Sequence, residues 1–267
     1  LREQYDNSVS HALEYYIADF ALSRFADALG KKKDAEMFYK RSLGYKHYYS
    51  KGFGTFRPIL PDGTFYSPFN PRQGENFEPN PGFHEGSSWN YTFYVPHDVY
   101  GLAKLMGGKK PFIDKLQMVF DEGLYDPANE PDIAYAHLFS YFKGEEWRTQ
   151  KETQRLLDKY FTTKPDGIPG NDDTGTMSSW AIFNMIGFYP DCPGLPEYTL
   201  TTPVFNKVTI RLDPKWYKEN ELVIETNRTQ PGTLYIDKVL LDGKKFNKYH
   251  ITHDELVHGK YLKFDLK

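Results

Sequence analysis

The hydrophobic pattern changes its period near residue 202, and this change constrains the fold more than any other feature of the sequence. Before it, apolar residues recur at helical spacing over residues 10–29, 98–106, 111–122, 132–142, 146–161 and 174–186. Beyond it, apolar and polar residues alternate, as in the segments 208–212, 222–224, 234–236 and 239–241. The sequence therefore predicts a mainly helical domain over residues 1–202 and a region of antiparallel strands over 203–267. These strands would form part of a sandwich whose other half is missing.

The helical part indicates hairpins of helices separated by long polar loops. Gly30 ends the first helical pattern in a left-handed turn, and a second helical pattern follows at once. Such hairpins, with functional loops between them, are typical of an α/α toroid. A helical-repeat scaffold is the alternative, but the sequence has no self-similarity at the 34-residue period of such repeats.

Charge and composition exclude several classes of function. The net charge is −3, with acidic and basic residues interspersed, so no basic surface for nucleic acid is expected. No apolar run of about 18 residues is present, which excludes a membrane-spanning helix. Aromatic residues make up 17% of the chain, an excess that favours a sugar-binding site because rings stack on sugar faces. The chain opens without an initiator methionine or a signal peptide, so we expect a piece of a longer protein.

The first segment that carries chemistry is 82–91, which leads into Val95-Pro96-His97-Asp98. Its one carboxylate, Glu85, lies between glycines and near several aromatic residues. A carboxyl group among aromatic rings is desolvated, and its pKa rises toward the range that a general acid needs. The alternative is that Glu85 only hydrogen-bonds the amides of its loop. Asp98 can likewise serve only as the cap of the following helix.

The second segment is 167–180, in which Asn171, Asp172 and Asp173 precede a predicted helix. Capping of that helix explains one acidic residue but not two. Adjacent carboxylates repel each other, and such a pair persists when a metal, a substrate hydroxyl or a catalytic proton offsets the cost. This segment therefore favours a functional site.

A third element is Asn129-Glu130-Pro131. Amide and carboxylate oxygens are ligands suited to Ca²⁺, while a loop that leads into a helix with proline in its first turn is equally good as plain structure. The histidines form no pair spaced as zinc ligands are, so zinc is disfavoured.

Both long segments, in their order, closely resemble glycoside hydrolase family 92. The similarity rests on Glu85-Gly86-x-x-Trp89-x-Tyr91 with Val95-Pro96-His97-Asp98, and on Gly170-Asn171-Asp172-Asp173-x-Gly175-x-Met177-Ser178-x-Trp180. The stretch 187–194 adds to it. The resemblance implies a calcium-dependent, inverting, exo-acting α-mannosidase that takes mannose-containing glycans and is exported to the bacterial periplasm or cell surface. It also implies the later part of an (α/α)6 barrel, with the N-terminal β-sandwich absent.

The resemblance further implies a role for each site residue. Glu85 matches the general acid and Asp173 the general base, with Asp172 or Asn171 assisting. Asn129 and Glu130 match a loop beside the sugar and its calcium, with Asn129 and Asn171 as candidate ligands. The side chains expected to contact substrate are His84, Trp89, His97, Asp98 and Glu130. Inversion requires the acid and base carboxyls to lie about 6.5–9.5 Å apart.

Two departures from the family pattern keep an alternative open. After Asn129-Glu130-Pro131 the family commonly has two histidines, whereas this chain has Asp132-Ile133-Ala134, and the preceding segment is short. A catalytically impaired carbohydrate-binding protein that retained the toroid is therefore the second hypothesis, and a helical interaction module is the third. For the isolated chain we expect little activity, because part of the pocket wall would be missing.

Overall fold

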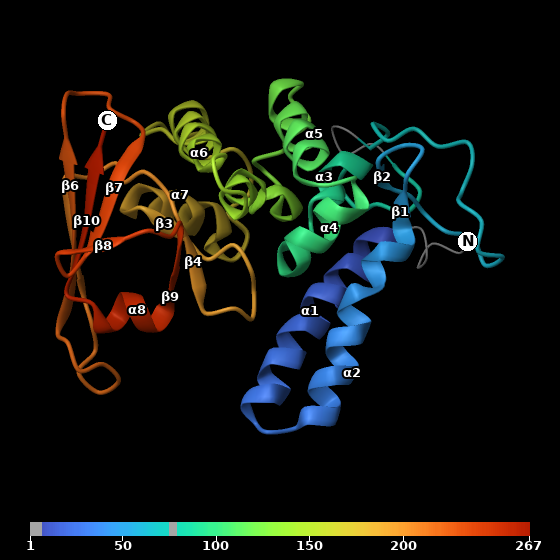
Figure 1. The fold of residues 1–267 in the computed structure, drawn as a ribbon. Coiled ribbons are helices and arrows are strands. Elements are labelled where there is room, and N and C mark those ends of the chain that lie inside the picture. Colours follow the sequence, from blue (N-terminus) through green and yellow to red (C-terminus); the bar gives the residue numbers. More distant parts are fainter. Residues whose placement is uncertain (1–6, 75–78) are drawn as a thin grey trace. The chain divides into compact units, whose positions relative to one another are not determined.

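The computed structural model describes residues 7–74 and 79–267. The chain divides into two compact units, the first within residues 1–135 and 192–195, the second made of 136–191 and 196–267. The described part is helical with smaller sheets, so the prediction of a helical part and a β part is confirmed at that level (Figure 1). The boundary predicted at residue 202 stays a prediction, since the two units part elsewhere. No described helix is both long enough and apolar enough to cross a membrane.

A helical hairpin opens the first unit. Helices α1 (Ser8–Ala28) and α2 (Lys32–Ser42) lie side by side, and Gly30 makes the turn at φ +72°, as predicted (Figure 1). A 3-10 helix, η2 (Leu43–Tyr48), and the short strands β1 (Tyr49–Ser50) and β2 (Thr55–Phe56) follow.

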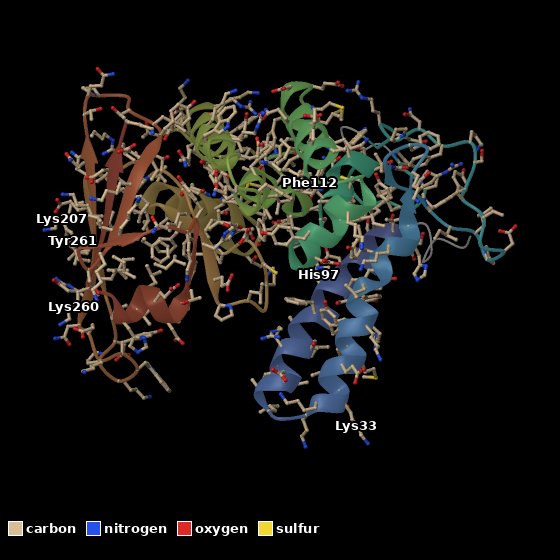
Figure 2. The ribbon with its side chains drawn as sticks, viewed as in Figure 1. Lys33, His97, Phe112, Lys207, Lys260 and Tyr261 are labelled. Carbon is tan, nitrogen blue, oxygen red and sulfur yellow. The ribbon has the colours of Figure 1, made fainter. Side chains whose placement is uncertain are left out.

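In the rest of the first unit, the loop that carries Glu85 leads into a series of helices. These are α3 (Ser88–Thr92), η4 (Pro96–Asp98), α4 (Val99–Leu105), α5 (Lys109–Asp121) and η5 (Glu130–Asp132). Their core is aromatic. The ring of Phe93 makes T-shaped contacts with Phe112 and Tyr135, with ring centroids 5.2 Å and 5.4 Å apart. Figure 2 labels Phe112 on α5. Much of the aromatic excess therefore fills the core, which weakens its use as evidence for a sugar site.

The helical residues of the second unit precede and follow the predicted Asp172-Asp173 segment. The continuous helix predicted over residues 132–142 does not form, because η5 ends at Asp132 and a separate 3-10 segment, η6 (Tyr135–Tyr141), follows it. Helix α6 (Glu146–Tyr160), the turn η7 (Asp173–Gly175) and α7 (Thr176–Ile186) come next. A small antiparallel sheet combines β3 (Phe188–Tyr189), β4 (Glu197–Leu200) and β9 (His250–Thr252). Because β9 pairs with β4, strands on both sides of residue 202 belong to one sheet.

A five-stranded sheet forms the remainder, in the order β5-β6-β10-β7-β8. Its strands are β5 (Lys207–Arg211), β6 (Glu221–Arg228), β7 (Ile236–Leu241), β8 (Lys244–Phe246) and β10 (Tyr261–Leu266), with α8 (His253–His258) before the last. The prediction of a wholly antiparallel sheet is wrong, because β10 runs parallel to β6. Alternation decides which face a residue occupies but not which strand lies beside it. In β10, Leu262, Phe264 and Leu266 are buried in alternation.

Asp191 is a buried carboxyl of the second unit, two residues after β3. The Thr199 hydroxyl donates a hydrogen bond to its Oδ2 at 3.1 Å, and burial raises the pKa of Asp191 to about 6. His250, which is paired with Thr199 across β4 and β9, shifts in the other direction, because burial lowers its pKa to about 4. The folded unit therefore favours the neutral form of both side chains.

Replacing Asp191 with Asn is expected to stabilise the protein at neutral and alkaline pH. Below the unfolded pKa of about 4, the Asp191 carboxyl is neutral in both the folded and the unfolded protein, and the folded state keeps its full stability. As the pH rises through the folded pKa of about 6, this contribution to stability is lost. A shift of about two pH units corresponds to about 3 kcal/mol. Asp191→Asn should therefore gain on the order of 2–3 kcal/mol in unfolding free energy at pH 8 and almost nothing at pH 4.

Urea unfolding of both proteins across this range measures the difference directly. His250 titrates in both proteins, so its contribution cancels, and Asn keeps an acceptor for Thr199. Equal stability of the two proteins at pH 8 would contradict the prediction.

Candidate active site

Glu85 sits in a strained turn of the first unit, just before α3. Its φ is +49°, in the left-handed region that residues other than glycine rarely adopt. The main chain around it is held by hydrogen bonds: Asn129 Nδ2 donates to the Glu85 carbonyl at 2.6 Å, and the Tyr91 hydroxyl donates to the His84 carbonyl at 2.7 Å. The His84 amide donates to the Ser10 hydroxyl at 2.8 Å. The turn is therefore fixed from three separate elements.

The Glu85 carboxylate is open, in contrast to its clamped main chain. Its side chain is 53% exposed, and its Oε1 lies 3.5 Å from His84 Nε2. The aromatic residues that follow it point elsewhere, since Trp89 and Tyr91 are 8% and 4% exposed and pack inside the unit. The expectation that these rings desolvate Glu85 is wrong. Its carboxyl group is available to a ligand, and only a ligand or further protein over it would remove it from water.

The loop that carries Asn129 and Glu130 contacts this turn. Asn129 uses both ends of its amide, since Nδ2 binds the Glu85 carbonyl and Oδ1 accepts the Glu130 amide at 3.1 Å. Asn129 is buried and Glu130 is partly exposed. Of the residues predicted for the first unit, His84, Glu85, Asn129 and Glu130 are thus brought together.

Glu14 on α1 joins this group and was not predicted. The Tyr94 hydroxyl donates to its Oε2 at 3.0 Å. Desolvation raises the pKa of Glu14, the Tyr94 bond lowers it, and the negative charge of Glu130 raises it again. Glu14 retains contact with solvent. Nothing in the sequence marks Glu14, because a glutamate on the polar side of a helix looks like any solvated residue.

His97 and Asp98 have structural partners in the first unit. Asp98 caps α4, because its Oδ1 accepts the Gly101 amide at 3.0 Å, and its Oδ2 accepts the Tyr45 hydroxyl at 2.8 Å. His97 Nε2 lies 3.0 Å from the Ser42 carbonyl, and burial lowers the pKa of His97. Asp98 therefore acts as the cap of α4, which is the structural alternative stated from the sequence. Figure 2 labels His97 beside α1. Their contact with substrate, like that of Trp89, stays a prediction.

In the second unit the two adjacent aspartates have different surroundings. Asp172 Oδ1 accepts the Ser178 amide at 3.0 Å and its Oδ2 accepts the Ser178 hydroxyl, and these bonds lower the pKa of Asp172. The side chain of Asp173 is exposed and has no hydrogen-bond or ion-pair partner within the described ranges. One aspartate therefore holds the start of α7, and the other is free to meet a ligand.

The backbone beside Asp173 is also strained. Thr174 has φ +52° and Gly175 has φ +76°, so the chain makes two left-handed steps before α7 begins at Thr176. A β-branched residue in this region is an outlier that costs on the order of 1–2 kcal/mol. The helix consequently starts two residues later than predicted, and Asp173 lies outside it with exposed Asn171 and Asp172.

The pair proposed as acid and base is divided between the units: Glu85 belongs to the first and Asp173 to the second. The 6.5–9.5 Å expected between their carboxyls therefore stays a prediction.

Comparison with known proteins identifies the family. The sequence profile of the glycosyl hydrolase family 92 catalytic domain matches residues 1–267. A protein of Arthroderma benhamiae described as an uncharacterized secreted glycosidase is 27% identical over 97% of this chain and 35% of its own length. The chain thus spans about a third of that relative.

Two solved structures from Bacteroides thetaiotaomicron are similar over nearly the whole chain. The family 92 α-mannosidase BT3965, in complex with mannoimidazole, is 30% identical with a TM-score of 0.89, covering 97% of this chain and 36% of its own. The inverting mannosidase BT2199 is 30% identical with a TM-score of 0.88, covering 100% of this chain and 38% of its own.

These matches define the class as that of glycoside-hydrolase catalytic domains. Within that class, the chain belongs to glycosyl hydrolase family 92. The resemblance stated from the sequence is confirmed.

Proposed function

We propose that this chain forms the later part of an inverting, exo-acting α-mannosidase that removes terminal α-linked mannose from mannooligosaccharides or N-glycans. The observation that carries the proposal is the state of Glu85, whose main chain is clamped by Asn129 while its carboxylate is 53% exposed. Family membership and the mannosidase names of the two Bacteroides relatives support the substrate class. An (α/α)6 barrel and a preceding β-sandwich belong to the same proposal.

The proposed reaction needs one acid and one base. The protonated Glu85 carboxyl donates its proton to the glycosidic oxygen as the bond to the anomeric carbon breaks. The Asp173 carboxylate takes a proton from a water molecule, whose oxygen attacks that carbon from the opposite face. The released mannose then has the inverted configuration.

The three residues of the second segment have distinct parts in this scheme. Asp172 holds Ser178 and so fixes the start of α7, which places Asp173 just ahead of the helix. Asn171 would orient the water or a sugar hydroxyl as a neutral amide. In the first unit, His84, which lies beside the Glu85 carboxylate, and Glu130, which follows Asn129, would bind sugar hydroxyls.

The proposed enzyme uses calcium, for which the first unit offers only a few candidate ligands. Among residues 7–74 and 79–267, no three His, Cys, Asp or Glu side chains gather as a metal site. Three oxygen donors of the first unit are the candidates, namely Glu14, Glu130 and the Asn129 amide, because a cation would relieve the repulsion between the negative charges of Glu14 and Glu130. These donors fit part of a calcium shell, in which the ion would hold sugar hydroxyls in place.

Mannose release by the intact protein that carries this chain tests the proposal. The substrates are α-1,2-, α-1,3-, α-1,4- and α-1,6-mannobiosides, each assayed with calcium and after treatment with a chelator. We expect release from at least one linkage as the inverted anomer, followed by NMR, with a loss of at least tenfold after chelation that added Ca²⁺ restores. No release from any linkage by the folded, calcium-loaded protein would favour the carbohydrate-binding alternative. Full activity after chelation would remove calcium from the proposal.

We further propose that the protein is exported, in line with the relative described as secreted. The isolated chain should have little activity, because it spans only 36% and 38% of the two solved relatives.

A further inference from the structure

We propose that Asp132 is the positioning residue that holds the Glu85 turn and the Asn129–Glu130 loop in one fixed arrangement. This inference deepens the proposed function and rests on it, since it assigns the residue that places the general acid.

Asp132 is completely buried, and one of its oxygens holds two segments together. Its Oδ2 accepts a hydrogen bond from Asn90 Nδ2 at 2.9 Å and a second from the Asp126 amide at 2.7 Å. Asn90 lies on α3 and Asp126 lies in the loop ahead of η5. A single side chain therefore joins the helix that follows Glu85 to the loop that leads to Asn129.

The path from Asp132 to the Glu85 turn runs through Asn90. Asn90 Oδ1 accepts both the Ser87 amide and the Ser87 hydroxyl at 2.8 Å, and Ser87 is two residues beyond Glu85. Asn90 Nδ2 also donates to the Leu124 carbonyl at 3.0 Å. Because Asn90 is 5% exposed, water cannot easily replace these bonds.

A second path reaches Glu85 from the other side. Asp132 ends η5, and Asn129 lies directly before that turn. Asn129 Nδ2 donates to the Glu85 carbonyl at 2.6 Å. The two paths close a circuit that runs from Glu85 through Ser87, Asn90 and Asp132 to Asn129 and back to Glu85.

The Glu85 turn needs such a circuit because its backbone is strained. A residue other than glycine at φ +49° relaxes unless its surroundings over-determine its conformation. If the Asp132 side chain were removed, the Asp126 amide would lose its hydrogen-bond acceptor, and Asn90 Nδ2 would lose one of its two acceptors. The loop would then no longer be tied to α3. A displacement of about 1 Å at a reacting group can cost up to about a hundredfold in rate.

The geometry of Asp132 predicts which substitution it tolerates. Both donors meet Oδ2, while Oδ1 has no hydrogen-bond partner among the described residues. The single carbonyl oxygen of asparagine can occupy the Oδ2 position and accept both bonds. Asp132→Asn should therefore preserve the arrangement, whereas Asp132→Ala should lose it.

The test compares these variants in the intact protein on two substrates, a mannobioside and an activated aryl mannoside whose leaving group needs little proton donation. We expect Asp132→Ala to lower kcat on the mannobioside by about 10- to 100-fold and to lower it much less on the aryl mannoside. Asp132→Asn should stay within about threefold of wild type on both. Asp19→Ala is the matched control, because Asp19 is a buried carboxyl of the same unit that pairs with Arg41 outside the circuit. It should not change the ratio of the two rates.

Two outcomes would overturn the inference: an equal loss on both substrates for Asp132→Ala, or an Asp132→Asn variant as impaired as Asp132→Ala. If Asp132→Ala does not fold, Asn90→Ala carries the same test, because it breaks the next link and should show the same dependence on the leaving group.

Amide hydrogen exchange separates this inference from the proposed function. Even if the wild-type protein released no mannose, faster exchange at Ser87 and Asp126 in Asp132→Ala, with wild-type exchange in Asp132→Asn, would support the circuit. Unchanged exchange at both amides in Asp132→Ala would overturn it.

Discussion

Replacing Glu85 with Gln is expected to lower kcat for mannose release from a mannobioside by two to four orders of magnitude, the contribution typical of a lost general acid. The amide cannot donate a proton to the departing oxygen. The fold should be unaffected, because the turn is held through the carbonyl of Glu85 and its neighbour, and the side chain is 53% exposed. Steady-state kinetics and a thermal unfolding midpoint measured on the same preparation check both statements.

The role of Glu85 as an acid predicts a dependence on the leaving group. The loss should shrink on an aryl mannoside with an acidic leaving group, which departs without protonation. Glu122→Gln is a matched control, since Glu122 lies in the same unit with the same 53% side-chain exposure and pairs only at the surface with Arg72. Equal losses on both substrates would show that Glu85 binds the sugar rather than protonating the leaving group.

Replacing Asp173 with Asn is expected to lower kcat by a similar two to four orders of magnitude, this time equally on both substrates, because the base acts on the attacking water. Asp173 is exposed, and its side chain has no partner among the described residues, so the variant should keep its stability. The comparison of kcat on both substrates, together with urea unfolding, is the measurement.

The neighbouring aspartate provides the contrast. Asp172→Asn removes one of the two acceptors that bind Ser178 at the start of α7 and should lower the urea unfolding midpoint slightly, with a smaller loss of rate than Asp173→Asn. Asp158→Asn, at an exposed site on α6, serves as a neutral control. A larger rate loss in Asp172→Asn than in Asp173→Asn would reverse the assignment of the base.

The sequence predicted several helices well where the signal is local. Periodicity placed α1, α5 and α6 within two residues of their observed bounds. Capping accounts for only one of the paired aspartates, as the sequence predicted: Asp172 binds Ser178, whereas the side chain of Asp173 has no hydrogen-bond or ion-pair partner among the described residues.

Features that depend on distant neighbours could not be predicted. The aromatic residues after Glu85 turn into the core rather than over its carboxylate, because a five-residue helix directs Trp89 and Tyr91 inward. Glu14 joins the site only through the packing of α1 against Tyr94. Strand β10 was missed, although Leu262, Phe264 and Leu266 alternate with polar residues, and its parallel pairing with β6 is a property of topology rather than of local sequence.

The position of β10 also matters for how the protein is made. Strands β6 and β7 are synthesised first, yet neither pairs with the other, because β10 lies between them. Their facing edges therefore stay unpaired on the ribosome until residue 266 has emerged, and unpaired edges invite association with other chains. During translation there is therefore a period in which the edges of β6 and β7 are exposed. A chaperone or slow elongation would have its largest effect on the yield of folded protein in this period.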